Sequence, residues 1–232
     1  MSTTPVVKGG GSKAQSSFAT RNHYWLRRLH SLSGIVPIGG FMLFHLYINA
    51  FALNGAAAFN KAAGSIEDQP GVRILEWVVI FIPLLYHAFY GLYIFFYAKQ
   101  NKVHYAYYRN WAFFLQRWTA IIALFFILYH TVALRFLTFG GKVPPNYTSV
   151  MQHLTDPWVL LIYVVGLLAT TFHLTNGIWA FLVSWGLTVG PRAQRVSAYV
   201  CGFLFIAISL LGVAIATHFY LVGNGVLGTI LS

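Results

Sequence analysis

The stretch that decides the fold runs from Trp118 to Leu134 and reads WTAIIALFFILYHTVAL, without one charged residue. A helix needs roughly 20 apolar residues to cross a bilayer. Comparable stretches recur along the chain, so the sequence predicts five transmembrane helices over residues 32–53, 74–98, 111–137, 157–185 and 196–222. The predicted fold class is therefore an all-α integral membrane protein, a five-transmembrane-helix bundle.

Composition agrees with lipid as the solvent. The chain is 58% hydrophobic and 8% charged, whereas soluble domains carry about 25% charged residues. A formal charge of +11 would suggest nucleic acid as the partner of a soluble protein. Here the basic residues lie in short segments between apolar runs, so we expect them to orient the protein and to contact anionic lipid headgroups or a cytoplasmic partner. No nucleic-acid partner is predicted.

The distribution of Lys and Arg predicts the orientation. Eleven of the fifteen lie in the N-terminal tail with the start of the first span, the second connector with its flank, and the fourth connector. Loops rich in these residues stay in the cytoplasm. We therefore predict a cytoplasmic N-terminus and an external C-terminus. Residues 1–20 read as a flexible cytoplasmic tail and residues 21–232 as a single transmembrane domain.

Histidine is the residue type that points to chemistry. Cys201 is the only cysteine, which excludes iron–sulfur and thiolate zinc sites within this chain. Four of the nine histidines lie deep in four different predicted spans: His45, His87, His130 and His173. A metal-binding side chain at that depth is costly and normally faces the bundle interior, so these four are predicted to be functional.

Depth predicts how the four histidines pair. Threading the spans in alternating directions puts His45 and His130 in the outer half of the bilayer and His87 and His173 in the inner half. Two histidines at one depth supply both axial nitrogens of a six-coordinate haem, which suits electron transfer. We therefore predict two b-type haems, held by His45 with His130 and by His87 with His173.

Further haem contacts are predicted from position alone. Gly91 and Gly177 follow His87 and His173 by one turn and would clear a surface for a porphyrin. Haem propionates need cationic or hydrogen-bonding partners near the bilayer surface. The candidates are Arg28, His30, Ser31, Arg117 and Arg192 for the inner haem, and Arg73 and Arg135 for the outer one. His218, in the last span, has no partner at matching depth and receives no role.

Several strings together resemble a known family. They are Arg27-Arg28-Leu29-His30-Ser31, Phe44-His45-Leu46, Leu85-Tyr86-His87-Ala88, Arg109-Asn110-Trp111, Leu115-Gln116-Arg117, Phe172-His173-Leu174-Thr175-Asn176-Gly177 and Pro191-Arg192-Ala193-Gln194-Arg195. In order and spacing, from about Arg21 to the last span, they resemble the two-haem cytochrome b membrane-anchor subunit of bacterial succinate dehydrogenase, in the succinate:quinone oxidoreductase and fumarate reductase family (complex II).

The resemblance implies a role and partners. It implies a membrane anchor in the bacterial cytoplasmic membrane, with a flavoprotein subunit and an iron–sulfur subunit on the cytoplasmic side. The chain would carry electrons to quinone, usually menaquinone, while the succinate site lies on another subunit. The family's ligands fall on His87 and His173 for the haem nearer the iron–sulfur protein and on His45 and His130 for the distal haem. A quinone site near Arg28 and Ser31 is a further hypothesis.

Three alternatives stay open at this stage. The first is the same role in a fumarate reductase, with quinol oxidation, which this subunit's sequence hardly separates from succinate oxidation. The second is a haem-free anchor that binds quinone. The third is a proton-coupled transporter with histidine relays, although the chain lacks the inverted repeats and intramembrane carboxylates expected of one.

Overall fold

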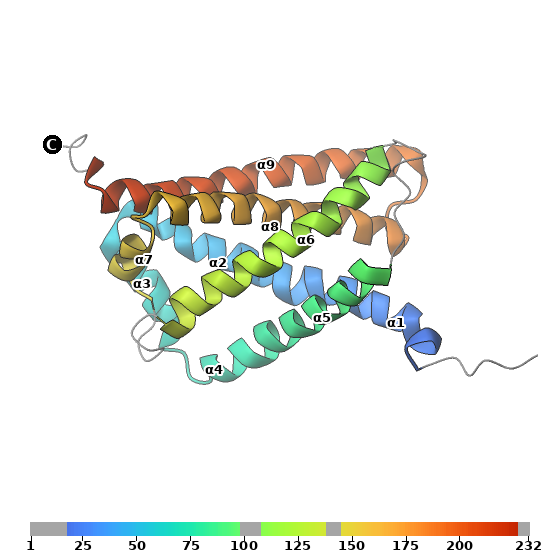
Figure 1. The fold of residues 1–232 in the computed structure, drawn as a ribbon, viewed down its shortest axis with the longest axis horizontal. Helices are drawn as coiled ribbons and strands as arrows, with labels where there is room; N and C mark the ends of the chain where they lie inside the picture. The colour runs from blue at the N-terminus through green and yellow to red at the C-terminus, as the bar shows by residue number, and fades with distance from the viewer. Residues whose placement is uncertain (1–17, 98–107, 138–144, 227–232) are drawn as a thin grey trace, which may run out of the picture.

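The protein is a bundle of long helices. The computed structural model describes residues 18–97, 108–137 and 145–226 (Figure 1). In this part of the chain, five helical segments are long and apolar enough to cross a membrane: His23–Asn54, Val72–Tyr97, Asn110–Leu137, Pro157–Ser184 and Gly190–Gly223. The predicted all-α fold with five spans is confirmed. Which end of the bundle faces the cytoplasm stays a prediction.

Three of the five spans are composite. Span one joins α1 (Phe18–Ser33), the π-helical η1 (Gly34–Gly39), α2 (Gly40–Ala50) and the 3-10 turn η2 (Phe51–Asn54). Span two joins α4 (Val72–Leu75), the π-helical η3 (Glu76–Phe81) and α5 (Ile82–Tyr97), and span three joins α6 (Tyr108–Thr131) and the π-helical η4 (Val132–Leu137). Pro37 lies inside η1 and Pro83 follows η3. Because proline cannot donate the helical hydrogen bond, a local change of helix type is expected there.

Spans four and five are the uninterrupted helices α8 (Pro157–Ser184) and α9 (Gly190–Gly223). The Asp156 carboxylate caps α8 by accepting from the N–H of Trp158 at 2.7 Å. Two helices begin earlier than the predicted apolar spans, since the first is helical from Phe18 and the last from Gly190. Charged residues at both starts had ended the apolar pattern, but helices extend past the hydrocarbon layer into the interface. The predicted tail, residues 1–20, lies outside the described residues up to residue 17.

Close packing of α6, α8 and α9 forms the centre of the bundle. A Cβ on Gly166 of α8 would stand 2.1 Å from the Phe126 ring of α6, so only glycine admits this contact. Thr171 of α8 and Ser209 of α9 are buried and share a hydrogen bond of 2.7 Å. Small and hydroxyl-bearing residues of this kind typically join helices in membranes. Large apolar side chains point outward instead, such as Phe89, Phe203 and Leu210.

Two short helices close one end of the bundle, which we call the α7 end. They are α3 (Ala56–Glu67) and α7 (Tyr147–His153), and both lie at the left of Figure 1. Tyr147 is buried against Phe59 and Phe219, and its hydroxyl lies 3.0 Å from Nε2 of His218. His218 therefore ties α7 to span five, a structural position that the sequence did not reveal.

Candidate functional site

The first histidine pair lies between span two and span four. The rings of His87 on α5 and His173 on α8 have centroids 6.1 Å apart and planes at 84°. Nδ1 of His87 donates to the carbonyl of His30 at 2.9 Å, and Nδ1 of His173 donates to the carbonyl of Gln116 at 3.1 Å. A proton held on Nδ1 leaves the Nε2 lone pair free. In both rings Nε2 is therefore the nitrogen that could bind a Lewis acid.

Span one packs against the His87 ring. The His30 ring stacks on it with centroids 4.0 Å apart and planes at 14°. A Cβ on Gly34 would stand 2.4 Å from Cε1 of His87, so span one approaches this ring closely because residue 34 has no side chain. Nδ1 of His30 is buried and has no hydrogen-bond partner among the described residues.

Gln116 of α6 orients His173. Besides accepting from the His173 ring, it donates from Nε2 to the His173 carbonyl at 3.0 Å, and its Oε1 accepts from Asn176 at 2.8 Å. Gln116 belongs to the string Leu115-Gln116-Arg117, for which the sequence predicted no role at this position. Only the match of this string to the family pointed to Gln116, since a lone glutamine in a span does not reveal which helix it faces.

The second histidine pair lies between span one and span three. His45 on α2 and His130 on α6 have ring centroids 5.7 Å apart and planes at 78°. Nδ1 of His130 lies 3.1 Å from the hydroxyl of Tyr163 on α8. Tyr163 and His173 are separated along α8 by about 15 Å, at 1.5 Å per residue. The two pairs thus occupy different depths of the bundle, with the second nearer the α7 end.

His45 is the least enclosed of the four. Its side chain is exposed on the surface of the bundle, whereas the other three are half-buried. Its Nε2 lies 3.3 Å from the Asn49 amide nitrogen, which also donates to the His45 carbonyl at 2.7 Å. Ligation through Nε2 would require the Asn49 amide to turn away from the ring.

Arg28 and Ser31 lie together at the end of the bundle opposite α7. The Arg28 guanidinium lies 4.7 Å from the Trp185 ring centre, and the Trp185 indole donates to the Ser31 hydroxyl at 3.1 Å.

The two glycines predicted to face a porphyrin both lie close to side chains. His30 contacts Gly91, where a Cβ would stand 3.2 Å from the His30 ring. Gly177 faces Gln116 rather than open space, with 3.4 Å from a Cβ to Nε2.

The remaining predicted propionate residues have other contacts. Arg117 donates to the carbonyl of Phe95. Arg135 forms a two-pronged ion pair with Glu76, at 2.7 and 2.9 Å, and Arg73 lies 3.6 Å from the same carboxylate. Arg192 lies exposed at the start of α9, where it lines a groove. Contact of any of these residues with a propionate stays a prediction.

Comparison with known proteins shows to which family the chain belongs. Residues 97–214 match the family described as succinate dehydrogenase/fumarate reductase transmembrane subunit. The succinate dehydrogenase cytochrome b558 subunit of Bacillus subtilis (strain 168) is 47% identical over 190 residues, which cover 82% of this chain and 93% of that protein. With five apolar spans and this extent of identity, the chain belongs to the family of succinate dehydrogenase/fumarate reductase transmembrane subunits.

Proposed function

We propose that this chain is the cytochrome b membrane anchor of a succinate dehydrogenase, that it holds two b-type haems, and that it passes electrons from an iron–sulfur partner subunit to quinone. The observation that carries the proposal is the pairing of four membrane-embedded histidines into two sets at different depths. The name of the Bacillus subtilis relative, a cytochrome b558 subunit, supports haem b as the cofactor.

The spacing of the rings fits a shared metal ion. A metal–imidazole bond is about 2 Å long, and the ring centre lies roughly 1 Å beyond its nitrogen, so two histidines that would hold one metal ion between them would have ring centroids about 6 Å apart. The observed separations are 6.1 Å for His87 with His173 and 5.7 Å for His45 with His130. The ring separations of both pairs are therefore compatible with one iron held between two histidines.

The surrounding residues fit the same role. When bound, a haem with two axial histidines supplies reversible one-electron chemistry and leaves no open iron site. The carbonyls of His30 and Gln116 hold the Nδ1 protons of the inner pair, which fixes the ring tautomer and raises the basicity of Nε2. Tyr163 holds His130 in the outer pair. Among the described residues, Nδ1 of His30 has no hydrogen-bond partner, so it is available as a donor or acceptor beside the inner pair.

The partners follow from the family. We propose a flavoprotein subunit and an iron–sulfur subunit bound at the end of the bundle where Arg28 and Arg192 lie, on the cytoplasmic side of a bacterial membrane. This chain has no dicarboxylate site of its own in the proposal, so it is not an enzyme by itself. We propose menaquinone as the quinone, and the Arg28, Ser31 and Trp185 cluster as its candidate binding site.

A spectrum tests the haem proposal directly. Haem is quantified per polypeptide in the purified complex, together with a dithionite-reduced minus oxidised spectrum. We expect two haems b in the wild type and one after substitution of any one of His45, His87, His130 and His173. His153→Asn is the control, because His153 lies in α7 outside the spans and should leave both haems in place.

Two results would contradict the proposal. A colourless wild-type complex would favour the haem-free quinone anchor. Loss of both haems from the His153→Asn control would mean that substitution of histidine disrupts the fold in general and does not report ligation.

A further inference from the structure

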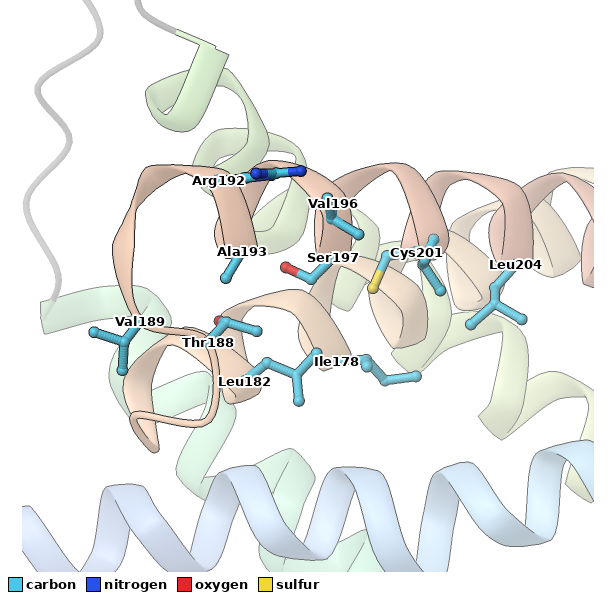
Figure 2. Close-up of a pocket in the computed structure, with 11 residues that line it drawn as sticks. Ile178, Leu182, Thr188, Val189, Arg192, Ala193, Val196, Ser197, Cys201 and Leu204 are labelled. Carbon is cyan, nitrogen blue, oxygen red and sulfur yellow. The ribbon is translucent and has the colours of Figure 1, made fainter.

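A groove on the surface of the bundle lies between α8 and α9, at the end opposite α7 (Figure 2). Its volume is about 680 Å³, within the range of ligand sites in proteins. Most of its lining is aliphatic: Ile178, Leu182, Val189, Val196, Val200 and Leu204. In Figure 2 the Cys201 sulfur is turned toward Ile178 across the groove. Since it runs several turns along α9 within the span, an occupant must have a long apolar portion.

The mouth of the groove is polar and positively charged. Arg192, in the first turn of α9, lines it and is exposed. Thr188 also lines it, and its hydroxyl is buried without a hydrogen-bond partner among the described residues. Val189 stands at the N-cap of α9 and offers no side-chain acceptor, so the first N–H groups of this 34-residue helix add to the positive potential.

No carboxylate of this chain neutralises that charge. The full sequence has four acidic residues, and they are Glu67, Asp68, Glu76 and Asp156. Asp156 caps the opposite end of α8, about 40 Å away along a helix of 28 residues, and the other three lie in or beside α3 and the start of span two, also toward the α7 end. The occupant that complements this mouth therefore carries the negative charge itself.

The turn that forms the mouth is braced by hydrogen bonds. Gly186 adopts a left-handed conformation with φ of 71°, and the N–H groups of Leu187 and Thr188 both donate to the carbonyl of Leu182, at 2.9 and 3.1 Å. The indole of Trp179 donates to the carbonyl of Gln194 at 3.0 Å, which ties α8 to the second turn of α9. These hydrogen bonds fix the turn and its position against α9 at the mouth of the groove.

We propose that this groove is a specific site for an anionic phospholipid, with one acyl chain between α8 and α9 and the phosphate at Arg192, Thr188 and the start of α9. An aliphatic channel that ends at an uncompensated arginine matches an acyl chain joined to a phosphate. A soluble partner does not reach the depth of Cys201 and Leu204. The inference does not depend on haem, so it stands or falls separately from the proposed function.

Lipid binding to the purified complex tests the site. Native mass spectrometry in a neutral detergent would follow titration with phosphatidylglycerol and, separately, with phosphatidylcholine. We expect one phosphatidylglycerol to be retained at concentrations where phosphatidylcholine is not. Arg192→Gln should weaken its retention about five-fold, the factor expected for one basic residue at an anionic membrane surface.

Two further variants separate the groove from general surface charge. Arg195→Gln removes the same charge three residues later on α9, but Arg195 does not line the groove, so we expect less than about a two-fold change. Ala193→Trp fills the groove and keeps both arginines, and it should abolish retention. Thermal unfolding of each variant checks that it is folded, and haem content tests the separate prediction that Arg192 contacts a propionate.

Four outcomes would overturn the proposal. Equal retention of the two lipids would indicate a non-specific apolar surface. Equal effects of Arg192→Gln and Arg195→Gln would indicate bulk electrostatics. Displacement of the lipid by menaquinone would make the groove a quinone site. Failure of the assembled complex to retain any phosphatidylglycerol would mean that the groove is not a lipid site in the complex.

Discussion

Substitution of Gly34 by alanine should remove one haem and leave the other. The new Cβ would stand 2.4 Å from Cε1, 2.9 Å from Nδ1 and 3.3 Å from Nε2 of His87. Carbon atoms prefer separations of about 3.5 to 4.0 Å, so the ring must move by more than about 1 Å. It is held against such movement by the His30 carbonyl and the stacked His30 ring. Overpacking of this kind costs about 1 to 3 kcal/mol.

Gly40→Ala is the matched control on the same span. A Cβ at Gly40 meets nothing within 4 Å, and alanine is favoured over glycine in a helix by about 0.5 to 1 kcal/mol. We therefore expect Gly40→Ala to keep two haems with equal or higher thermal stability, and Gly34→Ala to keep only the outer haem. Haem per polypeptide and electron paramagnetic resonance of the oxidised complex measure this. Two haems with unchanged spectra in Gly34→Ala would refute the position of the His87 ring.

Three other substitutions test the ion pair, the α7 end and the outer ligand. Glu76→Gln leaves the largely buried Arg135 without its carboxylate and should lower the free energy of unfolding by about 3 kcal/mol in a denaturant titration. Arg73→Gln changes a side chain that is 50% exposed, so it should lower the free energy of unfolding by less than about 1 kcal/mol. Burial lowers the pKa of His153 below its ordinary value of 6.5. The unfolded chain therefore binds the proton first as the pH falls, and thermal stability should decrease below about pH 6.5. His153→Gln should flatten this pH dependence of the melting temperature, and an unchanged slope would exclude His153 as its source. Tyr163→Phe removes the hydroxyl that lies 3.1 Å from Nδ1 of His130 and that would accept its proton when Nε2 holds iron. The change should raise the potential of the outer haem by roughly 40 mV, the one-electron equivalent of about 1 kcal/mol. A redox titration in which only the inner haem shifts would contradict this assignment.

The sequence predicted the spans well because the bilayer imposes one strong rule on composition and length. The same rule carries no information on helix ends that extend into water. The predicted last span therefore starts at Val196, whereas helix α9 begins at Gly190. The short helices α3 and α7 were missed for a related reason, since their connectors lack long apolar runs.

The sequence predicted less about the surroundings of the histidines. Depth follows from counting residues along a helix, which is why the rings that meet in the structure are those expected to share a depth. Rotation about the helix axis and contacts between distant segments do not follow from such counting. The roles of Gln116 and Tyr163 toward the rings were therefore not predicted, and the pairing of Arg135 with Glu76, 59 residues away, was also missed.

The π-helical segments make span one sensitive to the number of its residues. A π-helical turn accommodates one more residue than an α-helical turn, and each residue of an α-helix rotates the following chain by about 100°. Deletion of one residue between Ile35 and Ile38, which keeps Gly34 and Gly39, would let η1 relax to an ordinary α-helix with the angular phase of α2 nearly preserved. The same deletion after η1, between Gly40 and His45, would turn His45 by about a quarter of a circle away from His130. Span one therefore has a short segment where a length change is tolerated, next to one where it is not.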